Sequence, residues 1–271
     1  MKGFRFFILV FLLTLGFSGA EAQTAYQLAV LQRSIEPLYR KPTKDELAAI
    51  APNPRLFKKY SSFLDQSDTG LTRLVADSGC ADNTKVIVAT EDCMKYTMPG
   101  AGYSYSFRID NYRLPRLADL VFTDNSFQAS GVLLHGILVN IGDVPLEKVT
   151  LKTKGLKYLI NFQPVTDYDR AKEIDQELTA GIIEDGFIYR RGLYAVEDAT
   201  FVLRSIAYKG ANYRAVQGIT YNELDFDKRR DIIVAFRIVE KGEDGSITIL
   251  WKELDRKDSP EMKGTRKYER L

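Results

Sequence analysis

The clearest pattern of hydrophobic and polar positions along the chain is the alternation in residues 231–254. Its apolar positions recur at every second residue in two arms: Ile232, Val234, Phe236 and Ile238, then Ile247, Ile249 and Trp251. A period of two is typical of strands with one buried face, and the glycines at both ends of residues 242–245 favour a turn. The pattern therefore predicts a β-hairpin. Its register should place Ile238 opposite Ile249, Phe236 opposite Trp251 and Glu240 opposite Ile247.

This hairpin cannot be the whole fold, because an isolated hairpin is only marginally stable in water. It must pair with further strands or cover a helix. Strand-like runs supply candidates at residues 86–89, 103–108, 117–123, 127–141, 149–162, 187–194, 199–208 and 213–220. Tyr103, Tyr105 and Phe107 form an aromatic stripe on one of them. Packing in the core is the favoured interpretation of this stripe, and stacking on sugar rings or bases is the alternative.

Two stretches show the three- and four-residue spacing of helices instead. Residues 23–77 are expected to be helical, with a capping box at Thr43 and Glu46 and a second helix start at Asn53 and Pro54. A further helix is expected to begin near Thr166, with an apolar face made of Ala171, Ile174, Leu178 and Ile182. We expect this helix to cover one face of the sheet.

Together these elements predict an α+β fold, in which an N-terminal helical segment packs on an antiparallel, sandwich-like or barrel-like sheet with one covering helix. We divide the chain into a leader at 1–22, a helical segment with a disulfide loop at 23–98, a β-rich domain with one helix at 103–257 and a tail at 258–271. The tail is predicted to be mobile, because it is polar, mixed in charge and interrupted by proline and glycine.

The first 22 residues have the layout of a secretory signal peptide. Lys2 and Arg5 precede an apolar run at 6–17, and alanines flank Glu21 at the end. The run is short for a membrane span, so an uncleaved anchor is the weaker alternative. The prediction is export to the periplasm or the extracellular space, with no membrane-spanning segment after cleavage.

Export gives the two cysteines a role. In an oxidising compartment, Cys80 and Cys93 are expected to form a disulfide. The alternative is a redox or nucleophilic thiol, but the sequence has no Cys-x-x-Cys motif and no histidine near either cysteine.

Composition excludes several classes of function. Of the 271 residues, 45% are apolar and 27% charged, and the formal net charge is +2. This charge gives no electrostatic reason to bind nucleic acid or an anionic bilayer. The sequence contains no glycine-rich phosphate-binding motif, so we expect no nucleotide cofactor, and no other cofactor is indicated.

The single histidine of the chain, His135, restricts the chemistry further. One histidine excludes His-rich zinc sites, and we predict no metal site. A catalytic triad built on it would lack the Gly-x-Ser-x-Gly turn that presents the serine in many hydrolases. We therefore expect His135 to be hydrogen-bonded in or beside the core.

Acidic residues offer the remaining route to chemistry. Glu223, Asp225 and Asp227 alternate with Leu224 and Phe226. If extended, this row would place three carboxylates on one side, as a calcium ligand set or as the acid and base for a glycosidic bond. Basic residues follow at 228–230, so a neutralised, salt-bridged connection is the default interpretation.

These observations favour an exported non-enzymatic protein, a binding or structural module whose partner is a protein or a small ligand. The first alternative is a carboxylate-based hydrolase acting on glycans through Glu223 and Asp225, which requires two acids facing one cleft. A lipid carrier is the weaker alternative, because it requires a continuous apolar cavity.

Overall fold

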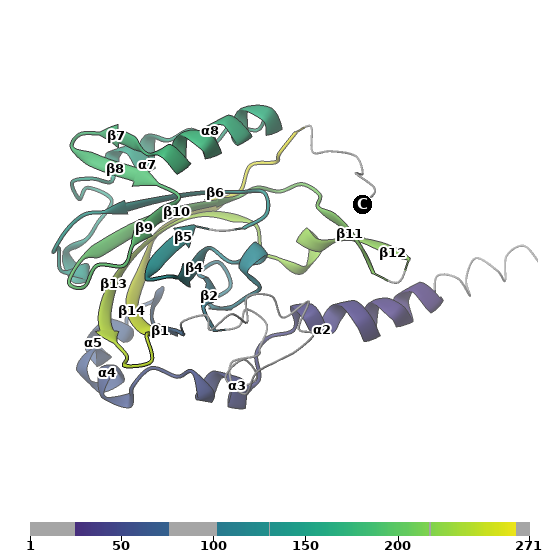
Figure 1. The fold of residues 1–271 in the computed structure, drawn as a ribbon, viewed down its shortest axis with the longest axis horizontal. Coiled ribbons are helices and arrows are strands. Elements are labelled where there is room, and N and C mark those ends of the chain that lie inside the picture. The colour runs from purple at the N-terminus through teal and green to yellow at the C-terminus, as the bar shows by residue number, and fades with distance from the viewer. Residues whose placement is uncertain (1–24, 76–101, 130, 217, 264–271) are drawn as a thin grey trace, which may run out of the picture. The chain divides into compact units, whose positions relative to one another are not determined.

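The computed structural model describes residues 25–75, 102–129, 131–216 and 218–263 (Figure 1). The chain forms two compact units, one made of Met1–Arg40 with Tyr213–Tyr221 and the other of Lys41–Asn212 with Asn222–Leu271. The signal peptide at 1–22, the short strand at 86–89 and the disulfide between Cys80 and Cys93 were predicted from sequence and lie outside the described residues.

The larger unit is built on an open seven-stranded sheet in which all the neighbouring strands are antiparallel. Its order from edge to edge is β1 (Thr69–Leu74), β14 (Ile247–Asp258), β13 (Arg230–Lys241), β10 (Thr200–Ala207), β6 (Leu134–Asn140), β8 (Phe187–Arg190) and β7 (Ile182–Glu184). The predicted α+β fold with an antiparallel, sandwich-like sheet is therefore confirmed.

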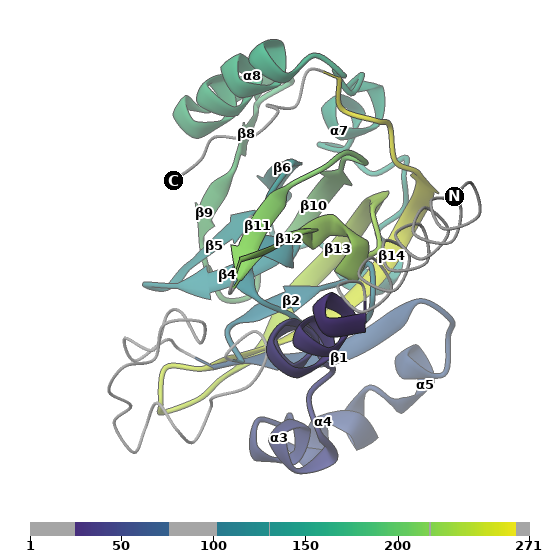
Figure 2. The same ribbon diagram turned by 90° about the vertical axis from the view of Figure 1, so that its right-hand side faces the viewer.

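A five-stranded sheet packs against one face of this large sheet (Figure 2). It contains, in order, β3 (Asn111–Tyr112), β2 (Ser104–Ser106), β4 (Leu120–Thr123), β5 (Ser126–Ala129) and β9 (Gly192–Tyr194). The interior between the two sheets is rich in aromatic rings. The ring of Phe127 lies 5.1 Å from that of Phe201 and 4.9 Å from that of Phe236, measured between centroids. Tyr105 and Phe107 belong to the same core, as the favoured interpretation of the aromatic stripe predicted.

Helices cover the opposite face of the large sheet (Figures 1 and 2). The predicted covering helix is α8 (Tyr168–Ala180), whose start is capped by Asp167 and whose buried side includes Ile174 and Leu178. Ile182, which the sequence pattern placed on this helix, instead lies in β7. Beside α8 lies a short helix, α7 (Lys157–Asn161), which was not predicted.

The strand predicted at residues 149–162 is wrong, because this segment holds turns followed by α7. Gly155 has a φ of 93°, a backbone conformation that interrupts any extended run. Beyond it, Leu156 and Leu159 are both fully buried and are spaced for a helix rather than a strand.

Three short helices precede the first strand of the large sheet: α3 (Lys44–Ala49), α4 (Pro54–Lys59) and α5 (Ser61–Leu64). The predicted capping box is present, since the Thr43 amide donates to Glu46 Oε2 at 2.6 Å and the Glu46 amide donates to Thr43 Oγ1 at 3.3 Å. The predicted cap at Asn53 is also present. The helical assignment fails at 69–74, which form β1.

The hairpin predicted at 231–254 is confirmed as β13 and β14. Ile238 lies opposite Ile249 and Phe236 opposite Trp251, as expected. A register shift between Ile238 and Glu240 places Glu240 opposite Thr248, so the third predicted pair is wrong by one residue. Further strands flank both arms, with β10 beside β13 and β1 beside β14.

Two of the other predicted strands are each divided between the two sheets. Residues 127–141 form β5 in the small sheet and β6 in the large one, while residues 187–194 form β8 and β9. The division of 187–194 positions the pocket described below.

The described part of the smaller unit contains η1 (Leu31–Ile35), α2 (Glu36–Tyr39), β11 (Tyr213–Val216) and β12, which spans Ile219–Asn222. The strand predicted at 213–220 is thus two strands of a hairpin. The hydroxyls of Tyr39 and Tyr221 lie 2.8 Å apart and share a hydrogen bond.

The C-terminal end of the described chain is docked on the larger unit. Backbone bridges join Lys209 to Glu261 and Asp167 to Lys263, and the Met262 side chain is buried. The tail was predicted at 258–271, and its described residues 259–263 contact Lys209, which follows β10, and Asp167, which precedes α8.

Candidate functional site

The predicted row of acids is not extended. Residues Glu223–Phe226 form a 3₁₀-helix, η4, whose first amides are capped by the Asn222 side chain. A 3₁₀-helix turns by about a third of a circle per residue, so alternating positions do not share one side. The three carboxylates therefore do not form the continuous row that an extended strand would give.

Each of the three acids has its own environment. Glu223 is fully buried, accepts a hydrogen bond from Arg116 Nε and a second from Asn212 Nδ2 at 3.0 Å. Asp225 is exposed and accepts a hydrogen bond from Asn222 Nδ2 at 2.8 Å.

Among the described residues, no group of three or more histidine, cysteine, aspartate or glutamate side chains is arranged to hold a metal ion.

Asp227, like Glu223, has a buried side chain. Its Oδ2 atom accepts from Arg108 Nη1 at 2.6 Å and from Arg229 Nη1 at 2.8 Å. The side chains of Asp227 and Arg108 are completely buried. The basic residues that follow were predicted to neutralise the acids, and Arg229 does so for Asp227. Arg230 instead pairs with Asp258, at 2.9 Å.

A second buried aspartate completes this ion-pair network. Asp119 accepts from Arg108 Nε at 2.7 Å, from Ser106 Oγ at 2.9 Å and from Ser205 Oγ. Ser106 lies on β2 of the small sheet and Ser205 on β10 of the large one. The network therefore links the two sheets across the interior.

The network is neutral as a whole, with two guanidinium groups and two carboxylates. Burial lowers the pKa of Arg229 to about 10, and the neighbouring charge of Arg108 acts in the same direction. Burial also opposes the charge of Arg108, but the carboxylates of Asp119 and Asp227 outweigh it and raise the Arg108 pKa. Because these four charged side chains are buried and paired with one another, we assign the network a structural role.

His135 lies on β6 and is a hydrogen-bonded residue of the core, as predicted. Its Nε2 atom is 2.8 Å from the Ala171 carbonyl, so this nitrogen carries the hydrogen, and the Tyr208 hydroxyl donates to Nδ1 at 3.0 Å. Asp175 lies 3.9 Å from Nε2. Burial is the main cause that lowers the His135 pKa.

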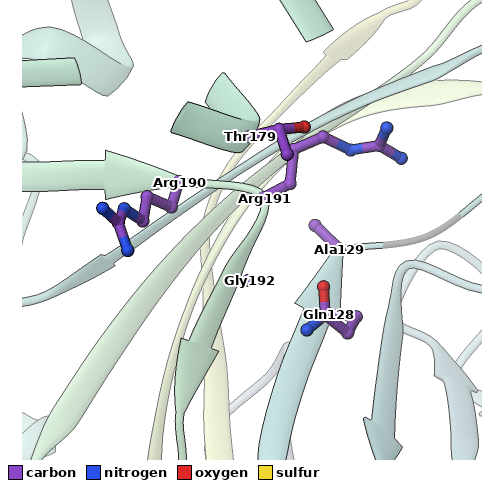
Figure 3. A pocket seen from close by; sticks show the side chains of 6 residues that line it. All are labelled: Gln128, Ala129, Thr179, Arg190, Arg191 and Gly192. Carbon is purple, nitrogen blue, oxygen red and sulfur yellow. The ribbon is translucent and has the colours of Figure 1, made fainter. Parts of the chain in front are cut away.

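A solvent-accessible pocket lies at the corner where the chain passes from β8 into β9 (Figure 3). Its volume is about 370 Å³, and its lining comes from β5, from the corner itself and from the last turn of α8: Gln128, Ala129, Thr179, Arg190, Arg191 and Gly192. We call it the corner pocket. Strand residues in succession point to opposite sides, and the two arginine side chains accordingly leave the chain in opposite directions (Figure 3).

The polar groups of the corner pocket have defined partners. Arg191 Nη1 donates to Asp175 Oδ2 at 3.0 Å, and the Thr179 hydroxyl donates to the Asp175 carbonyl at 2.7 Å. Arg190 Nη2 donates to the Ala180 carbonyl at 3.0 Å. This site was not predicted from the sequence, because no motif marks it and the only local signal is a pair of arginines before a glycine.

Comparison with protein-family models, with curated proteins and with solved structures finds no match. In the part of the chain that the structure describes, no helix combines the length and apolar character needed to cross a membrane. The function must therefore be argued from the site itself.

Proposed function

We propose that this protein is an exported, non-enzymatic binding module of the periplasm or the extracellular space, and that it binds its ligand at the corner pocket. The leader-like residues 1–22 support the location. A pocket of about 370 Å³ with polar groups at its surface supports the activity, because small-molecule sites of proteins begin near this size.

The observation that carries the proposal is the contrast between the candidate acids and the pocket. Glu223 and Asp227 are buried and accept hydrogen bonds from arginines, so they serve the framework. The polar groups of Gln128 and Arg190 instead lie on exposed side chains at an open pocket. This distribution favours ligand binding over hydrolysis by carboxylates.

The glycan hydrolase alternative requires two carboxyl groups on either side of one bond. Glu223 and Asp227 already direct their oxygens to Arg116, Arg108 and Arg229. A lipid carrier requires an apolar cavity, whereas four of the six residues that line the corner pocket are polar or charged. Neither alternative gains support from these contacts.

The test is to express the full chain in a bacterial host, to separate the exported from the cytoplasmic fraction, and to analyse the purified protein by native mass spectrometry. We expect the mature chain to begin near residue 23 and to retain a small molecule or a protein partner. Recovery of an unprocessed chain from the cytoplasm would contradict the location, and hydrolysis of a glycan panel would contradict the non-enzymatic role.

A further inference from the structure

We propose that the ligand of the corner pocket carries an oxyanion, a carboxylate or a phosphate group, which Arg191 binds. This inference rests on the proposed binding function and assigns the chemical class of the ligand. It follows from three features of the pocket: its charge, the way in which Arg191 is held, and the contact between Gly192 and Gln128.

The charge of the corner pocket is positive. Arg190 and Arg191 both line it, and Asp175 is the carboxylate paired with Arg191. Arg190 donates to the Ala180 carbonyl, and no carboxylate among the described residues forms an ion pair with it. The formal charges of these three side chains sum to +1, and both arginines line the pocket. A ligand with a negative group would neutralise it.

Arg191 is held in place for such a ligand. Its Nη1 atom donates a hydrogen bond to Asp175 Oδ2, and Asp175 itself belongs to helix α8. A guanidinium group has five N–H donors in a planar fork, so the pair with Asp175 leaves others for a second oxyanion. The Arg191 side chain is 31% exposed, which gives a ligand access to these donors.

Gly192 allows Gln128 to lie across the strand pair that borders the pocket. The two residues are directly opposite each other in β5 and β9. A Cβ atom at position 192 would lie 2.4 Å from Gln128 Oε1 and 2.6 Å from Gln128 Nε2. The glycine therefore leaves room for the carboxamide, whose N–H₂ group is a further donor for an oxyanion.

The experiment measures the binding of two simple probes, inorganic phosphate and succinate, to the full-length mature protein. Calorimetric titrations are performed at constant ionic strength with sodium chloride as the balancing salt. In parallel, the backbone amide signals of Arg191 and Gly192 are followed by NMR. We expect saturable binding of at least one probe with shifts at these two amides, and the preferred probe distinguishes a carboxylate ligand from a phosphate ligand.

Three variants locate the binding. Arg191→Gln should weaken the affinity by about tenfold or more, because it removes charge-assisted hydrogen bonds. Arg190→Gln removes only the unpaired charge and should weaken binding by about threefold. Arg170→Gln is the matched control: it removes the same charge from the exposed side of α8, where Arg170 pairs with Glu173, and should leave the affinity unchanged.

Absence of saturable binding by both probes would overturn the inference, and so would an equal loss in the Arg170 and Arg191 variants. Far-UV circular dichroism and thermal unfolding confirm that each variant is folded. The proposed function has a separate outcome. If the exported protein retains a neutral ligand whose binding Arg191→Gln does not affect, the binding function stands and the oxyanion assignment fails.

Discussion

At the scale of single residues, the interior of this protein holds charges that most proteins keep at the surface. Arg108, Asp119 and Asp227 have completely buried side chains. Removing water from such groups costs several kcal/mol per ion, and only mutual pairing with good hydrogen bonds offsets this cost. The network is therefore sensitive to the loss of any one member, whatever its net contribution to stability.

Asp119→Asn should destabilise the protein by about 3–5 kcal/mol, because it leaves the buried Arg108 with one carboxylate partner in place of two. Asparagine has nearly the same shape, so the effect reports the charge. Urea unfolding followed by tryptophan fluorescence measures the change, and Trp251 is the only tryptophan. The control is Asp225→Asn, an exposed acid, which should change the free energy of unfolding by less than about 0.5 kcal/mol. Equal effects of the two changes would contradict this account.

His135 predicts a pH dependence with a defined sign. Its folded pKa is lowered by burial, whereas an unfolded histidine titrates near pH ~6.5. Above that pH the His135 side chain is neutral in both the folded and the unfolded protein. As the pH falls below about 6.5 the unfolded chain binds the proton first, so the free energy of unfolding decreases until the folded histidine also titrates. Burial raises the pKa of nearby Asp175, so the folded state binds this proton before the unfolded state does as the pH falls. The Asp175 contribution to the free energy of unfolding therefore increases as the pH falls, opposite to that of His135.

The measurement is urea unfolding between pH 7.5 and 5 for the native protein and for His135→Gln. We expect the native protein to lose stability relative to the variant across this interval, by at most about 1.4 kcal/mol per pH unit. Two parallel curves would show that His135 binds a proton equally well in both states.

These residues also show which side-chain roles can be predicted from sequence. The environment of His135 was predictable, because it is a lone histidine inside an apolar strand. The neutralisation of Asp227 by Arg229 was predictable from their proximity in sequence. The ion pair between Arg108 and Asp227 was not predictable, because the two residues are 119 positions apart in the sequence and meet only in the folded structure.

At the scale of secondary structure elements, Gly136 of β6 lies close against Ala129 of β5, so the two sheets approach each other closely at this point. A Cβ atom there would lie 2.2 Å from the Cβ atom of Ala129 on β5. The absence of a side chain at 136 thus sets how near β5 and β6 can lie to each other.

Gly136→Ala should therefore destabilise the protein by about 1–3 kcal/mol through overpacking. The added methyl group has no room unless the backbone of one strand moves. The second change Ala129→Gly removes the opposing methyl group and should recover part of the loss. A double-mutant cycle by urea unfolding measures this coupling, and strictly additive effects would contradict the contact.

The success of element prediction depended on the length of the repeating pattern. The hairpin at 231–254 and the helix α8 were predictable, because each repeats its period several times. The error at 149–162 arose in a short apolar segment, where strand and helix patterns are hard to distinguish. The six residues of β1 were taken as the end of a helical stretch, because the strand is short and contains Gly70.

At the scale of the whole molecule, the described C-terminal residues 259–263 contact two parts of the larger unit that are distant in sequence, near Asp167 and near Lys209. Met262 is 5% exposed and packs in a small cluster with Ala171, Ile206 and Tyr208. Its neighbours in sequence bridge to Lys209 and to Asp167 at the start of α8. The segment therefore holds the covering helix against the sheet.

Met262→Ala should cost about 2–5 kcal/mol, as expected for truncating a buried methionine. Glu261→Ala is the control, because its exposed side chain leaves the backbone bridge intact, and it should be nearly neutral. Thermal unfolding measures both. A small effect of Met262→Ala would mean that this segment is only loosely attached in solution.

The corner pocket shows the limit of sequence analysis at this scale. Residues 187–194 have the pattern of one strand, and alternation alone does not reveal that the chain changes sheets at Arg191. The pocket arises from that change together with Thr179 and Gln128, which come from other parts of the chain. Three-dimensional assembly, rather than any local motif, creates the site.

The pairing of β1 with β14 has a consequence for how the protein is made. Thr69 lies opposite Lys252 and Leu74 opposite Ile247, so one edge of the large sheet joins an early strand to the last one. A ribosome must synthesise the chain through β14 before this edge can close, and contacts of such long sequence separation form slowly. A newly synthesised chain therefore lacks this strand pair until β14 has been made, and β1 has no partner strand in the large sheet before then.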